Sequence, residues 1–324
     1  MTERVVVAIV GTRYHDLSVE EEVLGPLGVE LVTGDGGSAE DILSVAASAA
    51  VVLAGSRPRF DDHVLARLDC HGIVRYGIGT DTIDLDAARR HGIAVARVSD
   101  YGTEAVAFHA ISLVTALLRR LREADRVVRA GEWGVAGLRP LHLPSRLTAG
   151  VVGYGRIGRQ TATYLRGLGF SLCAYDEYVD VPASDGVEAV SLDELLERSD
   201  VVTLHIPGGT DGTPLLDAPR LARMCPGSVL VNTARGSLVD VPALVRALAD
   251  GRPAAAALDV YPTEPPHVTA FDSVADRVLL TPHMAWYTEE SEMDMRRKAA
   301  EEAARLLRGE PLRDPVVASG VGAT

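Results

Sequence analysis

Short apolar runs alternate with helical segments along the first hundred residues. We expect the apolar runs at 5–10, 29–32, 50–55, 72–79 and 92–98 to be buried strands. Between them, segments such as 41–48 and 60–68 place apolar residues at the spacing of a helix. Strands without polar alternation, interleaved with helices, favour a parallel sheet that is covered on both faces.

A second series of the same kind follows a long helical stretch. That stretch runs from Thr103 through residues 104–133 and is apolar on more than one side, which predicts one long helix. The tail from Glu289 predicts an amphipathic helix that ends at Gly309, with Pro311 beyond as a stop signal. The apolar runs of the second series lie at 148–155, 170–176, 200–207, 227–236, 255–260 and 276–283.

Length and composition describe a globular chain. The 324 residues are enough for two domains of ordinary size, and the chain has 47% hydrophobic and 24% charged residues. No run of eighteen apolar residues predicts a membrane span. The six apolar residues before Gly11 are too few for the core of a signal peptide. We therefore expect a cytoplasmic protein without a membrane partner.

Charge and cysteine content exclude two further classes. The formal net charge of −13 repels a phosphate backbone, so we expect no nucleic-acid partner. The cysteines at 70, 173 and 225 are odd in number and form no CxxC pair, which is typical of reduced thiols that pack in a core. We predict neither a disulfide framework nor a metal site.

A glycine pattern directly follows the strand predicted near residue 150. Gly153, Gly155 and Gly158 stand in GxGxxG order before a helical segment. In dinucleotide-binding folds the three glycines allow a tight turn, close approach of backbone to a diphosphate, and close packing of helix on strand. The free N–H groups of the helix N-terminus then bind the anion. Because this chain has 31 glycines, the pattern by itself is weak.

The context of the next strand makes the pattern stronger. That strand ends at Asp176, at the distance where an acid should accept the ribose hydroxyls of the cofactor. Glu177 follows, and no arginine stands just after the two acids. Two carboxylates would repel a 2′-phosphate, so we expect NAD (NADH) rather than NADP. The alternative is a plain surface acid at the end of a strand.

Three further strand ends carry polar residues at the edge where a doubly wound sheet presents ligands. They supply Arg235, the acids Asp259 and Glu264, and His283. Reduction of a 2-oxo acid needs a cation for the carboxylate, a proton donor for the carbonyl oxygen, and a charge partner for that donor. These residue types suffice, although a lone histidine in an apolar context is more often structural.

The segments GYGRIG, VNTARG, LDVYPTEPP, TPHMAW and RYGIGTDTID, in this spacing, resemble the D-isomer-specific 2-hydroxyacid dehydrogenase family over almost the whole chain. TPHMAWYTEES and YGTEAVAFH look most like the branch that contains the C-terminal-binding-protein corepressors and their bacterial dehydrogenase relatives. The resemblance implies two Rossmann-like doubly wound parallel-sheet α/β domains. It implies a flavodoxin-like substrate domain, 1–100 plus 291–324, and an inserted NAD-binding domain, 101–290, whose helix and arm at 101–147 form a dimer.

The resemblance also implies residue roles. Arg235 would bind the substrate carboxylate, His283 would be the acid/base, and Glu264 its charge partner. Backbone N–H groups of Ile78 and Gly79 would hold the carboxylate. The cofactor-binding residues implied by the pattern are Gly153, Gly155, Arg156, Ile157, Gly158, Asp176, His205, Thr233 and Asp259, with His205 and Asp259 beside the nicotinamide.

Substrate specificity rests on weaker matches. Trp286 matches a pocket tryptophan of the corepressor branch, with core packing as the alternative. Arg75 matches a pocket arginine, and Arg57 could join it, although either is as readily a solvated surface arginine. A second cation would suit a 2-oxo acid with another anionic group.

The chain departs from the family pattern in two places. Phe108 stands where relatives usually carry an acid, which puts substrate size in doubt. Gly208, Gly209 and Gly212 replace bulkier residues and should loosen a loop near the cofactor. His109 we interpret as a structural histidine on a helix face.

The function expected is NAD-linked reduction of a small 2-oxo acid of the glyoxylate or hydroxypyruvate type, or of one with a second anionic group, in a homodimer. A phosphate- or phosphonate-bearing 2-oxo acid is an alternative substrate. An NAD(H)-sensing, corepressor-like scaffold with little turnover is the alternative function.

Overall fold

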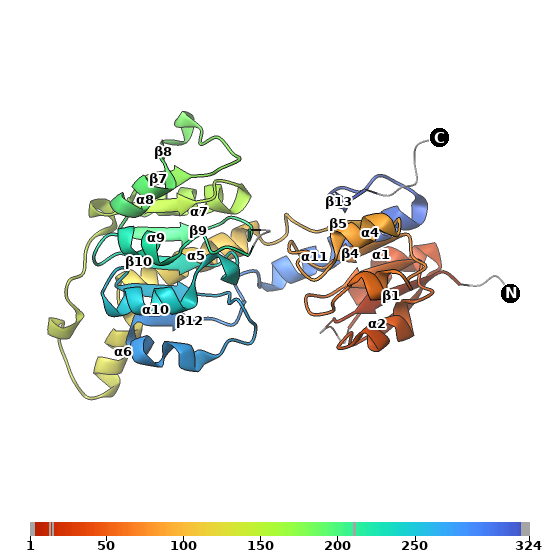
Figure 1. Cartoon of the computed structure of the whole chain (residues 1–324), viewed down its shortest axis with the longest axis horizontal. Helices are drawn as coiled ribbons and strands as arrows, with labels where there is room; N and C mark the ends of the chain where they lie inside the picture. The colour runs from red at the N-terminus through yellow and green to blue at the C-terminus, as the bar shows by residue number, and fades with distance from the viewer. Residues whose placement is uncertain (1–3, 13, 15, 210–211, 319–324) are drawn as a thin grey trace. The chain divides into compact units, whose positions relative to one another are not determined.

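The chain folds into two α/β units, seen in a computed structural model that describes residues 4–12, 14, 16–209 and 212–318. The first unit comprises Met1–Gly102 and Thr288–Thr324, and the second comprises Thr103–Tyr287. Figure 1 shows the helices and strands of both and labels many of them. The chain passes from one unit to the other twice, after Gly102 and after Tyr287.

The first unit contains a six-stranded sheet in the order β13-β5-β4-β3-β1-β2. The first five strands in sequence pair in parallel in a doubly wound, flavodoxin-like order, which confirms the expected fold class. The last strand pairs antiparallel with β5 at the edge and was not predicted. The strands are β1 (Val6–Val10), β2 (Glu30–Gly34), β3 (Val51–Ala54), β4 (Gly72–Arg75), β5 (Ala94–Arg97) and β13 (Pro315–Val317).

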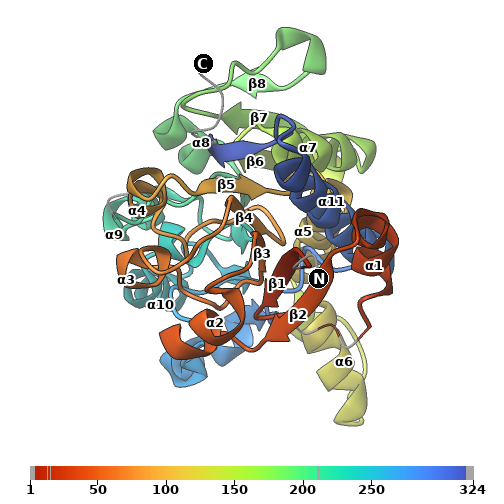
Figure 2. The ribbon, with the colours of Figure 1, turned by 90° about the vertical axis from the view of Figure 1, so that its right-hand side faces the viewer.

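Helices cover both faces of this sheet, as Figure 2 shows. One face carries α2 (Ala39–Ala46), α3 (Asp62–Leu65) and α4 (Leu85–Arg90), and the other carries α1 (Ser18–Leu24) and α11 (Glu289–Arg308). The long helix α11 ends where the sequence predicts, because Gly309 adopts the left-handed conformation (φ 66°) that glycine tolerates best.

The only lysine of the chain lies on α11. Its Nζ is 2.7 Å from a carboxylate oxygen of Asp294 and 3.0 Å from one of Asp100. Asp100 lies two residues before the first passage between the units. Lys298 therefore ties the segment that leaves the first unit to the helix α11.

The second unit contains an all-parallel sheet in the order β12-β11-β10-β9-β6-β7-β8. Starting from β8 and counting β6 as the first strand of the unit, the order is 3-2-1-4-5-6-7. This order extends the Rossmann order and changes direction between β6 and β9. The strands are β6 (Thr148–Val152), β7 (Ser171–Tyr175), β8 (Glu188–Ala189), β9 (Val201–Leu204), β10 (Val229–Asn232), β11 (Ala255–Leu258) and β12 (Val278–Leu280).

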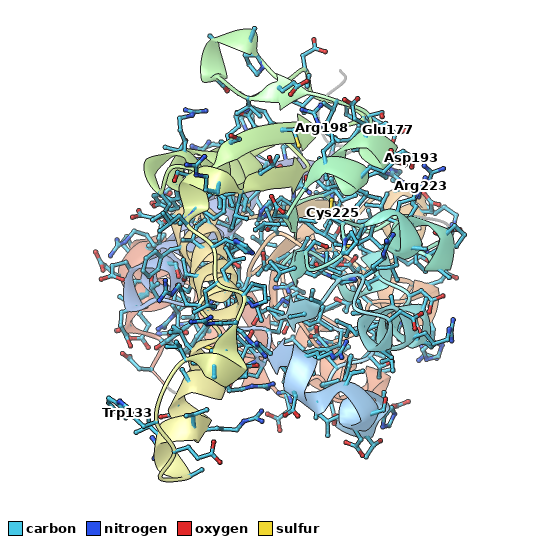
Figure 3. All side chains as sticks on the ribbon, turned by 90° about the vertical axis from the view of Figure 1, so that its left-hand side faces the viewer. Trp133, Glu177, Asp193, Arg198, Arg223 and Cys225 are labelled. Carbon is cyan, nitrogen blue, oxygen red and sulfur yellow. The ribbon has the colours of Figure 1, made fainter. Side chains whose placement is uncertain are left out.

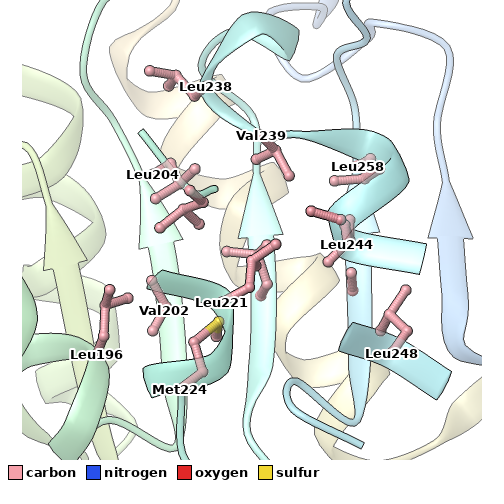
Figure 4. Close-up of a cluster of buried hydrophobic side chains, with 14 of the residues drawn as sticks. Leu196, Val202, Leu204, Leu221, Met224, Leu238, Val239, Leu244, Leu248 and Leu258 are labelled. Carbon is pink, nitrogen blue, oxygen red and sulfur yellow. The ribbon is translucent and has the colours of Figure 1, made fainter. Parts of the chain in front are cut away.

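Two apolar cores lie on the two faces of this second sheet. The helices α5 (Thr103–Leu118) and α7 (Arg156–Gly167) pack on one face, where Ala110 and Val114 of α5 are fully buried. The helices α8 (Leu192–Arg198), α9 (Ala218–Arg223) and α10 (Val241–Ala249) pack on the other, over the leucine-rich cluster of Figure 4. The 3-10 helical segments of the two units are η1 (Gly25–Leu27), η2 (Ala136–Leu138), η3 (Pro144–Arg146), η4 (Ala183–Asp185), η5 (Gly236–Leu238) and the longer η6 (Val268–Arg277).

The prediction of one long helix from Thr103 to about residue 133 is wrong. Helix α5 ends at Leu118 and α6 (Leu121–Arg129) begins after Arg120, whose φ of 48° is left-handed and breaks the helical path. The arm beyond α6 carries Trp133, which is 91% exposed and points away from the ribbon in Figure 3. Within the described residues, no helix is both long and apolar enough to cross a membrane.

Candidate active site

The glycine motif lies where the second sheet changes direction. Gly153 follows β6 with a φ of 96°, and a Cβ there would lie 2.7 Å from the backbone oxygen of His205, which follows β9. A Cβ on Gly158 would lie 1.9 Å from the backbone oxygen of Gly153. Both positions therefore need glycine, because any side chain would separate the packed backbones.

Gly155 is different, because a Cβ there would meet open space. It is the N-cap residue of α7 and makes no side-chain capping bond. The half-buried Ile157 and the exposed Arg156 lie in the first turn of α7. This turn, with an open approach and N–H groups at a helix N-terminus, suits the diphosphate of a dinucleotide.

Asp176 directly follows β7 and is held in place by backbone donors. Its Oδ2 accepts a hydrogen bond from the N–H of Tyr154 at 2.6 Å, which links it to the glycine motif. Its Oδ1 accepts from the N–H groups of Tyr178 (2.8 Å) and Val179 (2.9 Å). A carboxylate oxygen can accept two hydrogen bonds, so Oδ2 keeps capacity for a ribose hydroxyl. Glu177 beside it is exposed.

Two polar side chains that follow strands of the second sheet have buried atoms without a hydrogen-bond partner. These atoms are Nδ1 of His205 and Oγ1 of Thr233, which follow β9 and β10. The other ring nitrogen of His205, Nε2, lies 3.0 Å from Oγ1 of Thr203. Burial lowers the pKa of His205 to about 3, so the ring is neutral at physiological pH. Unpaired buried polar atoms in this position fit a cofactor that would supply their partners.

Arg235 is positioned by the turn that follows β10. The side chain of Asn232, which is buried, donates from Nδ2 to the backbone oxygen of Arg235 (2.8 Å) and accepts from the N–H of Ala234 (3.0 Å). The arginine itself is half-buried and donates from Nη1 to the oxygen of Ala234 at 2.8 Å. A Cβ on Gly208 would lie 3.7 Å from the Cβ of Arg235, so the predicted glycine loop reaches this arginine.

His283 and Glu264 are hydrogen-bonded at the same edge of the sheet. The imidazole Nδ1 lies 2.7 Å from Oε2 of Glu264, and Oε1 of the glutamate accepts the N–H of Tyr261 at 3.1 Å. The histidine side chain is 47% exposed, and its Nε2 is the ring nitrogen that Glu264 does not contact. This arrangement orients the imidazole and leaves its second nitrogen for proton transfer.

The turn that carries His283 is built around a buried carboxylate. His283 has a φ of 52°, a left-handed conformation that is rare for residues other than glycine. Asp259, which is completely buried, accepts the hydroxyl hydrogen of Thr281 (2.6 Å) and the N–H groups of Met284 and Ala285 (each 2.9 Å). The side chain of Asp259 has no exposed surface. Its contact with the nicotinamide therefore stays a prediction.

The remaining predicted residues take varied positions. Trp286 belongs to the same turn and donates from Nε1 to the backbone oxygen of His283 at 3.0 Å. In the first unit, Arg75 ends β4 and its guanidinium donates to the backbone oxygen of Tyr76. Ile78 and Gly79 follow in the next loop and are half-buried, while Arg57 is exposed in the loop after β3.

Sequence reasoning missed the location of one residue. His109, interpreted as a structural helix-face histidine, lies on α5 with its Nε2 3.2 Å from Oγ1 of Thr281 and 3.7 Å from Oδ1 of Asp259. No local pattern signals this contact, because His109 and Thr281 are 172 positions apart.

Phe108, the neighbour of His109, is 64% exposed. Gly209 is exposed, Gly212 has a φ of 72°, and the part of their loop at 210–211 lies outside the described residues. In the described part of the chain, no group of His, Cys, Asp and Glu side chains could hold a metal ion.

Comparisons with known proteins identify the family. Residues 111–285 match the model of the D-isomer specific 2-hydroxyacid dehydrogenase, NAD binding domain. The chain belongs to this family. The fold is also that of D-lactate dehydrogenase from Escherichia coli in its apo form, with a TM-score of 0.83, 30% identity, and coverage of 96% of this chain and 100% of that one. The NAD-binding domain of the family therefore coincides with the glycine motif and the sheet edge described above.

Two further relatives define the similarity. D-lactate dehydrogenase from Aquifex aeolicus, solved with NAD and lactic acid, has a TM-score of 0.85 and 27% identity, covering 94% of this chain and 96% of that one. D-3-phosphoglycerate dehydrogenase from Archaeoglobus fulgidus is 35% identical over 292 residues, covering 89% of this chain and 55% of the relative. The chain thus spans about half the length of the curated relatives it matches. The resemblance to the corepressor branch stays a prediction.

Proposed function

We propose that this chain is an NAD(H)-dependent D-2-hydroxyacid dehydrogenase that reduces a small 2-oxo acid. The reaction adds one hydride and one proton to a carbonyl group. NADH supplies the hydride when bound, and His283 supplies the proton from Nε2 to the carbonyl oxygen. The observation that carries this proposal is the 2.7 Å contact between Nδ1 of His283 and Glu264, which orients the ring for that transfer.

Arg235 has the chemistry to orient the substrate. A guanidinium binds a carboxylate through two parallel hydrogen bonds, which fix both charge and direction. The backbone of Arg235 is fixed by Asn232, so its side chain starts from a defined position. In the first unit, the N–H groups of Ile78 and Gly79 are the proposed carboxylate donors. In the second unit, Trp286 is proposed to contact the substrate.

For the substrate, we propose a 2-oxo acid of the glyoxylate or hydroxypyruvate size, or one with a second anionic group. Arg57 follows β3 and Arg75 ends β4, and these two strands are neighbours in the sheet, with Ala54 paired to Arg75. Two cations at adjacent strand ends suit a phosphate or phosphonate better than a methyl group. The similarity to a D-3-phosphoglycerate dehydrogenase favours testing this alternative.

For the cofactor, we propose that Asp176 favours NAD over NADP and that Arg156, Ile157, His205, Thr233 and Asp259 complete the binding site. We also propose that the first unit is the substrate domain and that the chain forms a homodimer through residues 101–147. The exposed Trp133 in this segment supports an interface. Light scattering at micromolar concentration should give twice the chain mass, and a monomer mass would contradict the dimer.

The first test is the initial rate of NADH oxidation with a panel of small, branched, dicarboxylic, phosphate-bearing and phosphono 2-oxo acids, each repeated with NADPH. Turnover of one member supports the proposal, and an Arg235→Lys variant should then lose about 10-fold or more in kcat/KM, because lysine lacks the planar fork. Tight NADH binding without turnover of any member would instead favour the alternative, an NAD(H)-sensing scaffold.

A further inference from the structure

Resting on the function proposed above, we propose that His109 is a positioning residue for the proton donor. It would act from α5 through Thr281 and Asp259, and hold the turn Thr281–Ala285 in the conformation that presents His283. None of the reacting groups touches His109 in this proposal. Its contribution is the geometry of the turn.

The hydrogen-bond directions define this role. The Thr281 hydroxyl has one hydrogen, and at 2.6 Å it donates that hydrogen to Oδ1 of Asp259, because a carboxylate only accepts. The same hydroxyl oxygen therefore accepts from Nε2 of His109 at 3.2 Å. This requires the hydrogen of the neutral imidazole to be on Nε2, so His109 orients the hydroxyl toward the carboxylate.

The carboxylate of Asp259 then fixes the turn itself. It accepts the N–H groups of Met284 and Ala285, which flank the left-handed His283 on its C-terminal side. The N–H of His283 donates to the backbone oxygen of Asp259 at 2.8 Å. A residue in a strained conformation keeps it only when several surrounding interactions hold it there, and these hydrogen bonds hold His283. Asp259 and Thr281 follow the strands β11 and β12, whereas His109 belongs to the helix α5.

The surroundings of His109 argue against mere packing. Its side chain is 18% exposed, whereas the core of this face is made by Ala110 and Val114 of the same helix. Burial lowers the pKa of His109, although the charge of Asp259 opposes this, so the ring is a neutral donor at physiological pH. A neutral donor adds no charge next to the buried carboxylate.

Two substitutions and a control test this role. His109→Leu removes the donor and keeps an apolar volume, whereas His109→Gln keeps an N–H at about the position of Nε2. We expect kcat of the Leu variant to fall about 10-fold, with KM for NADH changed less than twofold and most of kcat restored in the Gln variant. Ser112→Ala is the control, since that exposed side chain bonds only to the backbone oxygen of Phe108 on its own helix.

A measurement without turnover separates this inference from the proposed function. Hydrogen exchange of the Met284 and Ala285 amides should be about 10-fold faster in His109→Leu than in wild type, and near wild type in His109→Gln and Ser112→Ala. Equal exchange in the Leu variant and wild type would overturn the proposal, whether or not any 2-oxo acid is reduced. Equal losses of kcat in the Leu and Gln variants would also overturn it.

The pairing with Thr281 gives a second check. Thr281→Val removes the hydroxyl that His109 orients, so the effects of His109→Leu and Thr281→Val on amide exchange should be far less than additive when combined. Additive effects would mean that the two residues act independently, which contradicts the proposal that His109 acts through Thr281.

Discussion

Gly236 has no room for a side chain, because a Cβ there would lie 1.9 Å from the backbone carbonyl carbon of Tyr261. The two residues belong to the turns after β10 and β11, and these turns carry Arg235 and Glu264. Backbone therefore packs directly on backbone between the proposed carboxylate-binding residue and the charge partner of His283.

Substitution Gly236→Ala should disrupt both turns. We expect a loss of stability of about 1–3 kcal/mol from overpacking, together with loss of most activity, measured by thermal unfolding and initial rates. The matched control is Gly167→Ala near the end of α7, where a Cβ meets open space and stability should rise by about 0.5–1 kcal/mol. A Gly236→Ala protein as stable as wild type would contradict the close approach.

The left-handed conformation of His283 predicts a conflict between stability and activity. His283→Gly and His283→Ala should each reduce the rate by about 10²–10⁴, as expected for a lost acid/base. The Gly variant should be about 1 kcal/mol more stable than the Ala variant, because only glycine adopts a φ of 52° without steric cost. Denaturant unfolding of the two variants measures this difference, and equal stabilities would show that the turn carries no strain.

The charge of Asp176 should set cofactor preference. Asp176→Asn removes the charge and one acceptor for backbone N–H groups, so we expect NADH to bind about 10-fold more weakly while NADPH loses little or gains. Fluorescence titration with both cofactors gives the two dissociation constants. Glu177→Gln removes the neighbouring exposed charge and should change them much less. An unchanged NADH to NADPH ratio in Asp176→Asn would exclude this role.

His205 predicts a pH effect on stability. Its pKa is about 6.5 unfolded and about 3 folded because of burial, so the unfolded chain binds more protons between these values. Stability from this residue is complete above about pH 6.5 and is lost as the pH falls toward 3. His205→Gln keeps a nitrogen near Thr203 and does not titrate. Between pH 7.5 and 5, the unfolding midpoint should fall further in wild type than in the variant, and equal falls would contradict the prediction.

The sequence alone predicted the fold class because both series of strands are short, apolar and separated by helices. It could not predict the break at Arg120, because the segment from Leu117 to Arg129 contains neither glycine nor proline. At the break, Nη1 of Arg120 donates to the backbone oxygen of Gly137 in the arm at 3.4 Å. Tertiary contacts of this kind override local propensity.

The candidate site shows the same division. Arg235, Glu264 and His283 could be found because each follows an apolar strand at the ligand-presenting edge of a parallel sheet. The network of His109, Thr281 and Asp259 could not, because its members come from three elements and each residue alone reads as structural. Only the packing of α5 on the sheet brings the imidazole to the hydroxyl.

Chemical modification of Lys298, the single lysine, can report on the segment where the chain first passes from one unit to the other. Burial disfavours the charged amine of Lys298, but the hydrogen bonds that it donates to Asp294 and Asp100 outweigh this and raise its pKa. A protonated amine is a poor nucleophile toward acylating reagents. The rate at which this side chain is acylated should therefore report how often the segment at Asp100 separates from Lys298. The other basic side chains of the chain are guanidinium or imidazole groups.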